Sequence, residues 1–279
     1  PESYPLDDPE ELDQSICKWT SLSQRVFTIS ESTRLEVLGL IPQEADKVHA
    51  VPLAADRPAS RFETSSRINP SIGDKTPFFL YPSAANPHKN HLLLFQAALK
   101  LDKRGLDFRI VLTGGHTQFL LEQTPMDLSI PEQARVFYQE NKGRLADRII
   151  ATANVPLQEL ETLYEKCLAV VFPSQYEGFG LAVAEAFAHG KPVIASDLPV
   201  IKEQIDCYQA SDFVETFSAT NSTALADLME NRLEKGPISE DRRKKLCKKT
   251  SLWTWTDVAN TYLKIMQESV EGSARGANS

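Results

Sequence analysis

Between residues 78 and 216, short apolar runs alternate with stretches in which apolar residues recur every three or four positions. Apolar runs of this length are typical of strands buried on both faces of a parallel sheet. Their alternation with helical stretches predicts an α/β fold built on a doubly wound parallel sheet. The expected strands are 78–81, 108–112, 148–151, 169–172, 192–195 and 213–216.

The first 56 residues carry a shorter pattern of the same kind. Apolar residues at helical spacing predict a helix over 9–24, and a second helix is expected over 31–40 with Ser30 as its N-cap. Strands are expected at 25–30 and 47–53. We therefore treat residues 1–56 as a small α/β unit ahead of the main sheet.

Residues 57–77 are rich in Pro, Ser, Arg and Asp and have no periodicity, which predicts a linker. The main domain then covers 78–253 and ends in helices near 221–235 and 239–249, capped by Asn221 and Ser239. A last helix is expected at 254–270, within a C-terminal segment of 254–279. The residues from Glu271 are small and polar, and we expect them to be disordered.

The stretch from Pro173 to Ser196 has the most informative pattern of the chain. It follows a predicted strand, turns at Gly178 and Gly180, and continues as a short apolar helix that stops at Gly190. A helix that starts directly after a buried strand presents free N–H groups and the positive end of its dipole. This arrangement predicts a phosphate site.

Two carboxylates bracket this site, Glu177 before the turn and Glu185 in the helix. Glu185 falls outside the apolar arc of the helix, so we expect it to face the crevice. An isolated pair of this kind is most often solvated. The glycine turn between the two residues favours a ligand-binding role instead.

Composition narrows the class of protein. The chain has 279 residues, is 42% hydrophobic and 24% charged, and carries a net charge of -8, which disfavours a nucleic-acid partner.

The four cysteines are Cys17, Cys167, Cys207 and Cys247. They lie far apart without metal-ligand spacing, which predicts reduced thiols and a cytoplasmic protein. The basic run 242–249 is ordinarily a solvated helix face, with peripheral contact to anionic lipid as the alternative.

The motif from Pro173 through Glu185 resembles the E-x7-E signature of retaining glycosyltransferases of the GT-B fold. That large group includes sucrose synthases, glycogen synthases and many bacterial mannosyltransferases. The resemblance runs in order from about Val26 to Trp255. It implies that residues 78–253 are the Rossmann-like domain that binds the nucleotide sugar, and that 1–56 are a remnant of the N-terminal, acceptor-side Rossmann-like domain.

The same resemblance implies roles for individual residues. Glu177 and Lys89 are the catalytic residues: Glu177 contacts donor-sugar hydroxyls and Lys89 holds the diphosphate. Glu185 contacts the ribose. The other donor-binding residues it implies are Ser83, Asn90, Gly114, Gly115, Gly178, Phe179, Gly180 and Leu181. No metal and no cofactor is required in this scheme, because lysine and the helix dipole neutralise the leaving group.

The chain departs from the family pattern in the loop that contains Lys89. Ala84 stands where the family has an arginine, and Ser83 replaces a glycine. The Pro-His-Lys-Asn-His form of this loop is similar to mannosyl- and rhamnosyltransferase-like sequences and slightly favours GDP-mannose as donor. His91 and His116 are expected to be polar surface residues.

The resulting interpretation is a transferase that moves a sugar from a nucleotide-sugar donor to a glycan, a lipid or another acceptor with retention of configuration. The alternative is a non-catalytic nucleotide-sugar-binding or interaction subunit of the same fold. The chain begins with Pro1 rather than Met, so we expect a fragment that is inactive alone and needs an upstream half or a partner chain. Fold resemblance by itself does not decide between these alternatives.

Overall fold

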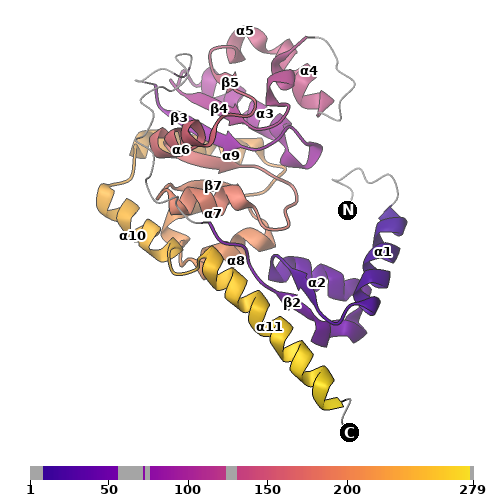
Figure 1. Cartoon of the computed structure of the whole chain (residues 1–279). Coiled ribbons are helices and arrows are strands. Elements are labelled where there is room, and N and C mark those ends of the chain that lie inside the picture. Colours follow the sequence, from indigo (N-terminus) through magenta and orange to yellow (C-terminus); the bar gives the residue numbers. More distant parts are fainter. Residues whose placement is uncertain (1–8, 56–71, 73–75, 124–130, 277–279) are drawn as a thin grey trace.

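The computed structural model describes residues 9–55, 72, 76–123 and 131–276. The main part is a parallel sheet with helices on both faces, and residues 9–55 form a smaller unit beside the C-terminal helix (Figure 1). The predicted linker at 57–77 lies almost entirely outside the described residues. Ile72 within it is buried, and the Arg109 guanidinium donates a hydrogen bond to its carbonyl.

All six predicted strands of the main sheet are confirmed, with small shifts at their ends. They run parallel in the order β5-β4-β3-β6-β7-β8. All residues of β6 and β7 are buried, because helices cover both faces of the sheet. The strands are β3 (Phe78–Pro82), β4 (Arg109–Thr113), β5 (Ile149–Ala151), β6 (Ala169–Phe172), β7 (Val193–Ser196) and β8 (Val214–Phe217).

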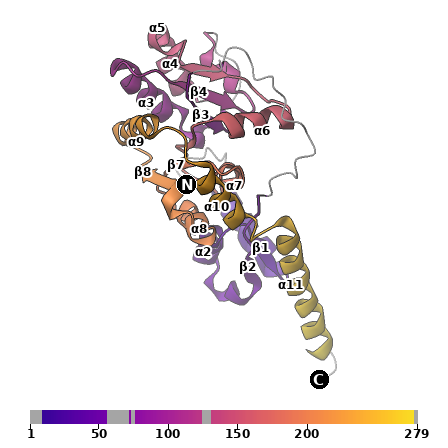
Figure 2. The same cartoon turned by 90° about the vertical axis from the view of Figure 1, so that its left-hand side faces the viewer.

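The helices of the main part lie in two layers. Figure 2 shows α3 and α9 on one face of the sheet and α6 and α7 on the other, and α10 packs on α7. The α-helices are α3 (His91–Lys103), α4 (Glu132–Glu140), α5 (Lys142–Leu145), α6 (Leu157–Lys166), α7 (Leu181–Ala188), α8 (Pro199–Cys207), α9 (Ser222–Lys235), α10 (Glu240–Thr250) and α11 (Trp255–Gly276). The 3-10 helices are η2 (Pro87–Lys89), η3 (Thr117–Leu121) and η4 (Ser211–Phe213).

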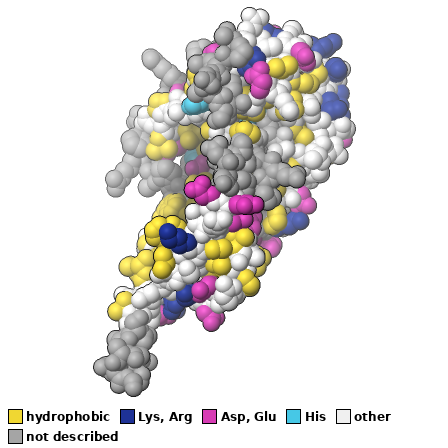
Figure 3. Space-filling view, turned by 90° about the vertical axis from the view of Figure 1, so that its right-hand side faces the viewer, with side chains coloured by type: hydrophobic (Ala, Val, Ile, Leu, Met, Phe, Trp, Pro, Cys, Tyr) yellow, Lys and Arg dark blue, Asp and Glu magenta, His cyan; other side chains and the backbone are white. Residues whose placement is uncertain are grey.

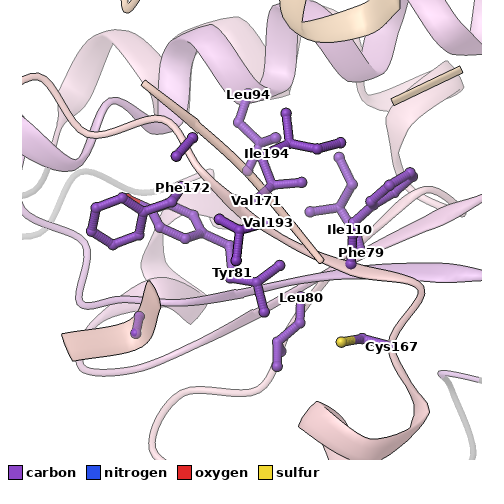
Figure 4. Packing of buried hydrophobic residues seen from close by; sticks show 14 of the residues in the cluster. Phe79, Leu80, Tyr81, Leu94, Ile110, Cys167, Val171, Phe172, Val193 and Ile194 are labelled. Carbon is purple, nitrogen blue, oxygen red and sulfur yellow. The ribbon is translucent and has the colours of Figure 1, made fainter. Parts of the chain in front are cut away.

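The core lies between these layers. Aromatic and branched side chains of the central strands pack together there, among them Phe79, Tyr81, Val171, Phe172 and Ile194 (Figure 4). The caps predicted for the last helices are confirmed: the Asn221 side chain accepts hydrogen bonds from the first turn of α9, and the Ser239 hydroxyl accepts one from the first turn of α10.

The order of the strands creates a switch point in the sheet. From β3 the chain moves outward to β4 and β5, then returns to the other side of β3 with β6. The loops that follow β3 and β6 therefore leave neighbouring strands in opposite directions. In open α/β sheets a crevice for ligands forms outside the carboxyl ends of the strands at such a point.

The N-terminal unit contains α1 (Pro9–Leu22), β1 (Val26–Thr28), α2 (Glu31–Leu40), η1 (Pro42–Lys47) and β2 (Val48–Ala50). Both predicted strands are confirmed and pair with each other in parallel, with α2 in the crossover. The expected Ser30 cap is present, with Ser30 Oγ accepting from Thr33 N at 3.0 Å. Helix α11 lies beside this unit, where Tyr262 packs on Phe27 with ring centroids 4.4 Å apart.

The prediction of a disordered tail from Glu271 is wrong for residues 271–276, because α11 continues to Gly276. The residues from 254 carry apolar side chains at helical spacing, and the helix extends beyond the last of them. Several large hydrophobic side chains of α1 and α11 are exposed, including Trp19 and Val270. Figure 3 shows such side chains on the narrow lower part of the molecule. Among the described helices, none has the length and apolar character needed to cross a membrane.

Candidate active site

Two loops meet at the switch point, one after β3 and one after β6. The Gln175 N–H donates to the His88 carbonyl at 2.8 Å, and the Asn90 side-chain amide donates to the Pro173 carbonyl at 3.0 Å. Asn90 itself adopts a left-handed backbone conformation with a φ of 58°. These bonds fix the spacing between the loop that carries Lys89 and the loop that carries Glu177.

Lys89 and Glu177 form an ion pair across the crevice. Lys89 Nζ lies 2.6 Å from Glu177 Oε1, and the two side chains are only 18% and 10% exposed. The ammonium group also lies 5.8 Å from the centre of the Phe172 ring, within reach of a cation–π contact. The sequence placed both residues at one site, and the structure brings them into direct contact.

The turn after Glu177 is held by close packing on both sides. Gly180 has a φ of 85°, which a residue with a Cβ rarely adopts, and it precedes α7 directly. Gly178 is constrained differently: a Cβ there would lie 3.2 Å from Ile29 Cδ1 of the N-terminal unit. Gln204 of α8 donates from its side-chain amide to the carbonyls of Phe179 and Gly180.

These elements enclose a cavity of about 430 Å³. Its walls come from the main sheet domain and, through Ile29 and Leu53, from the N-terminal unit. Lys89 is the cationic side chain among the described residues that line it. The lining residues are Ile29, Leu53, Pro82, Ser83, Ala84, Lys89, Phe172, Glu177, Gly178, Phe179, Gly180, Leu181 and Ala182.

Four of the predicted donor-binding residues do not line this cavity: Asn90, Gly114, Gly115 and Glu185. The Asn90 amide is engaged by the Pro173 and Ala219 carbonyls. Gly114 lies against the backbone after β3, since a Cβ on it would be 2.6 Å from the Ser83 carbonyl carbon. The donor contacts of these four residues stay predictions.

Glu185 points toward α6. Its Oε2 accepts a hydrogen bond from the Tyr164 hydroxyl at 2.6 Å, and the Tyr164 ring stacks on His189 with an interplanar angle of 3°. Burial raises the pKa of the Glu185 carboxyl above its usual value, and the Tyr164 hydrogen bond partly offsets this. The Tyr164 side chain is itself buried, and this burial raises the pKa of its hydroxyl.

The expectation for His91 is wrong, because its side chain is fully buried. His91 begins α3 and packs against the Tyr81 ring with centroids 5.1 Å apart. Burial lowers the pKa of His91 to about 3, so the ring is neutral at ordinary pH. His116, in contrast, is exposed and adopts a φ of 69°.

The sequence pattern did not identify the residues outside the two motifs that line or support the cavity: Ile29, Leu53, Tyr164 and Gln204. Ile29 and Leu53 were assigned only to predicted strands, and their place in the cavity wall depends on packing between the two units. Tyr164 and Gln204 lie on ordinary amphipathic helices. For Tyr164, an aromatic residue next to Leu163 among the apolar positions of the helix was the available signal. For Gln204, the polar residue on a buried face of α8 was the signal.

Among the described residues there is no group of three or more acidic, histidine or cysteine side chains that could hold a metal ion. The groups at the cavity are instead one lysine, one glutamate and the start of α7. The N–H groups in the first turn of a helix have no intrahelical acceptor and carry partial positive charge. The site is therefore equipped to bind a phosphate and a hydroxylated group next to it.

The fold is that of the GT-B glycosyltransferases. A glycosyltransferase from Rickettsia africae matches with a TM-score of 0.67 at 18% identity, covering 88% of this chain and 64% of that one. Sucrose-phosphate synthase from Thermosynechococcus elongatus matches with a TM-score of 0.68 at 18% identity, covering 93% and 62%. At such identities these likenesses establish the fold alone.

The chain belongs to the group 1 glycosyl transferases, whose family model matches residues 62–250. It is 33% identical over 133 residues to the O-antigen chain mannosyltransferase RfbU of Salmonella typhimurium, which is 47% of this chain and 32% of that protein. It is 25% identical over 210 residues to the O-antigen chain mannosyltransferase B of Escherichia coli, 74% of this chain and 51% of that one. The chain thus spans about half or less of these relatives.

Proposed function

We propose that this chain is the donor-binding part of a retaining glycosyltransferase that moves a sugar from a nucleotide sugar to a glycan, a lipid-linked acceptor or a related hydroxyl compound. The observation that carries the proposal is the cavity at the switch point of the sheet, with Lys89, Glu177 and the start of α7 on its walls. Membership of the group 1 glycosyl transferases supports it.

The first catalytic task is to stabilise the diphosphate as it leaves the sugar. Lys89 supplies a compact positive charge, and the N–H groups of Gly180, Leu181 and Ala182 lie at the positive end of α7. Lys89 is paired with Glu177 in this structure. An ammonium group has three N–H donors, so Lys89 can bind a phosphate oxygen beside Glu177 and interact with the developing charge.

The second task is to stabilise positive charge at the anomeric carbon. Glu177 lies in the same cavity wall as Lys89, on the loop before Gly178. Two mechanisms use a carboxylate at this place: attack on the anomeric carbon to form a covalent intermediate, and electrostatic support of attack from the front face. In both, the sugar–phosphate bond breaks and the diphosphate leaves with the electron pair. The acceptor oxygen bonds to the anomeric carbon, displacing the carboxylate in the covalent route, and its proton passes to the leaving phosphate oxygen.

We place the nucleoside of the donor next to Glu185. Because Tyr164 occupies Oε2 of this carboxylate, we assign Oε1 to a ribose hydroxyl. GDP-mannose is the donor that we favour. Its support is the mannosyltransferase naming of the O-antigen relatives and the Pro-His-Lys-Asn-His form of the loop. Function in the cytoplasm, with peripheral contact to a membrane that carries the acceptor, belongs to the same proposal.

Binding and turnover by two variants test the proposal. Glu185→Ala is expected to weaken GDP binding, because the ribose loses an acceptor. Glu177→Gln is expected to retain GDP binding, because Lys89 keeps its charge, and to abolish transfer by a form of the protein that includes the upstream half. Calorimetry with GDP and a transfer assay with GDP-mannose measure the two effects. Wild-type turnover by Glu177→Gln contradicts the proposal.

One observation favours a second candidate, a non-catalytic subunit that binds nucleotide sugars. Ala84 lies in the cavity wall at the position where the family has an arginine, which leaves Lys89 as the cation among the described lining residues. Donor-dependent transfer, or donor hydrolysis, by the longer form excludes this candidate. The chain of 279 residues alone is expected to bind donor without efficient transfer, because closing two domains over the donor orients the acceptor and excludes water.

A further inference from the structure

Helix α8 contacts both walls of the donor cavity through neighbouring residues. Gln204 holds the turn on one side by donating to the Phe179 and Gly180 carbonyls. Glu203 points the other way, into the N-terminal unit. Its Oε2 accepts from the Glu31 N–H at 2.8 Å, and its Oε1 accepts from the Ser32 N–H at 2.6 Å and from the Ser32 hydroxyl.

The Glu203 carboxylate thus occupies the N-terminus of α2, although it lies 171 residues or more away in the sequence. An anion at this end of a helix satisfies N–H groups that have no intrahelical acceptor and interacts favourably with the helix dipole. Ser30 fills the remaining position, because its hydroxyl accepts from Thr33 N. The N–H groups of Glu31, Ser32 and Thr33 thus have acceptors within the protein.

The same end of α2 lies on the Glu177 loop. The Thr33 hydroxyl donates to the Gly178 carbonyl at 3.3 Å, and Ile29 lies so close to Gly178 that a Cβ there would be 3.2 Å from it. One helical turn further, Glu36 accepts a hydrogen bond from the Tyr176 hydroxyl at 2.9 Å. Burial, and secondarily Glu36, raise the pKa of Tyr176 to about 12, so this hydroxyl remains a donor.

We propose that Glu203 is a positioning residue for donor binding: by holding the N-terminus of α2, it keeps Ile29 against Gly178 and so sets the wall of the cavity beside Glu177. Glu203 does not line the cavity itself and acts through α2. The inference rests on the proposed function, in which Glu177 faces the donor sugar. It predicts an effect on the sugar end of the donor and little effect on the nucleotide end.

The variant Glu203→Gln tests this, with Asp206→Asn as the matched control. Asp206 is exposed on the same helix, so the control makes the same change in charge without touching α2. GDP-mannose and GDP are titrated into each protein. We expect Glu203→Gln to bind GDP-mannose about tenfold more weakly than the control does. This is the lower end of the range of affinity losses expected when a charge-assisted hydrogen bond is removed. GDP affinity should stay within about twofold of the control.

Hydrogen exchange measures the contact without any ligand. Glu203→Gln is expected to speed exchange of the Glu31 and Ser32 amides relative to Asp206→Asn, because one of their carboxylate acceptors is replaced. Ser32→Ala, which keeps the carboxylate and removes one hydroxyl, is expected to change both measurements in the same direction by a smaller amount. This second variant keeps the test valid if Glu203→Gln does not fold.

The outcomes separate the two proposals. If the wild-type chain binds neither GDP-mannose nor another nucleotide sugar, the proposed function fails, whatever the exchange data show. If it binds GDP-mannose and Glu203→Gln binds it as tightly as Asp206→Asn does, the role of Glu203 is overturned and the proposed function stands. Equal loss of GDP-mannose and GDP affinity also overturns it, because a general loss of structure lowers both.

Discussion

The Lys89 ammonium lies 2.6 Å from the Glu177 carboxylate, between two loops that follow neighbouring strands of the sheet. Both side chains are largely shielded from water, so each charge depends on the other for its stabilisation. Removing one partner of such a pair leaves the other uncompensated, which costs more than the pair itself contributes. The pair therefore links the loop that carries Lys89 to the loop that carries Glu177.

Lys89→Ala is expected to weaken binding of GDP and of UDP to the chain. A hydrogen bond to a charged group contributes about 1.5 to 3 kcal/mol, which corresponds to a loss of about 10- to 150-fold in affinity. Calorimetric titration measures this, with guanosine as the ligand that lacks the diphosphate. If the wild-type chain binds guanosine as tightly as it binds GDP, the assignment of Lys89 to the diphosphate is incorrect.

Gly114→Ala is expected to destabilise the fold, because a Cβ would lie 2.6 Å from backbone atoms of Ser83 and because Gly114 has a φ of 140°. Backbone strain of this type costs about 1 to 3 kcal/mol, and the overlap adds to it. Gly115→Ala is the matched control, since its Cβ would come no closer than 3.9 Å, to the Ala84 Cβ. The free energies of unfolding of the two variants, measured in urea, should differ by more than about 1 kcal/mol, and equal values would contradict the close approach of Gly114 to Ser83.

Tyr164→Phe is expected to change the pH dependence of GDP binding. Burial raises the pKa of Glu185 and the Tyr164 hydroxyl lowers it, so losing the hydroxyl raises the pKa further. A carboxylate that accepts from ribose binds in its charged form, and affinity is lost as the pH falls through this pKa. In the variant, the loss should begin at higher pH than in the wild type. GDP titrations across the acidic range measure the pH at which half of the affinity is lost. If this midpoint is the same in Tyr164→Phe and in wild type, Glu185 does not contact the nucleotide.

The same shift predicts how Glu185→Gln affects stability. The folded-state pKa of Glu185 is above the ordinary value of 4.5. Its contribution to stability is therefore fully present below that value and is lost as the pH rises through the folded pKa. Relative to wild type, Glu185→Gln should gain in melting temperature as the pH rises from 4.5 through the folded-state pKa of Glu185. A constant difference across this range would show that the carboxyl is not shifted.

Chelation is expected to leave donor binding unchanged, because lysine and the α7 dipole provide the positive charge. GDP titrations with EDTA and with added Mg²⁺ test this. A gain of more than about tenfold in affinity with Mg²⁺ would show that the metal contributes at least 1.4 kcal/mol and that the metal-free scheme is wrong.

The sequence by itself determined the architecture of the main domain. Short β-branched apolar runs fit strands covered on both faces, and their spacing with amphipathic stretches fits a parallel sheet with crossover helices. It also determined the turn at Gly180 and the caps at Ser30, Asn221 and Ser239, because these depend on neighbouring residues in the chain. Local physics of this kind is readable from one sequence.

Contacts between distant segments were decided only by the tertiary structure. Nothing in the sequence near Glu203 indicates that its carboxylate reaches the Ser32 N–H, or that Ile29 rests on Gly178. His91 was misjudged for the same reason, because the packing of α3 against the Tyr81 ring decides its burial. Propensities report on neighbours along the chain, whereas burial and pairing depend on which surfaces meet when the whole chain folds.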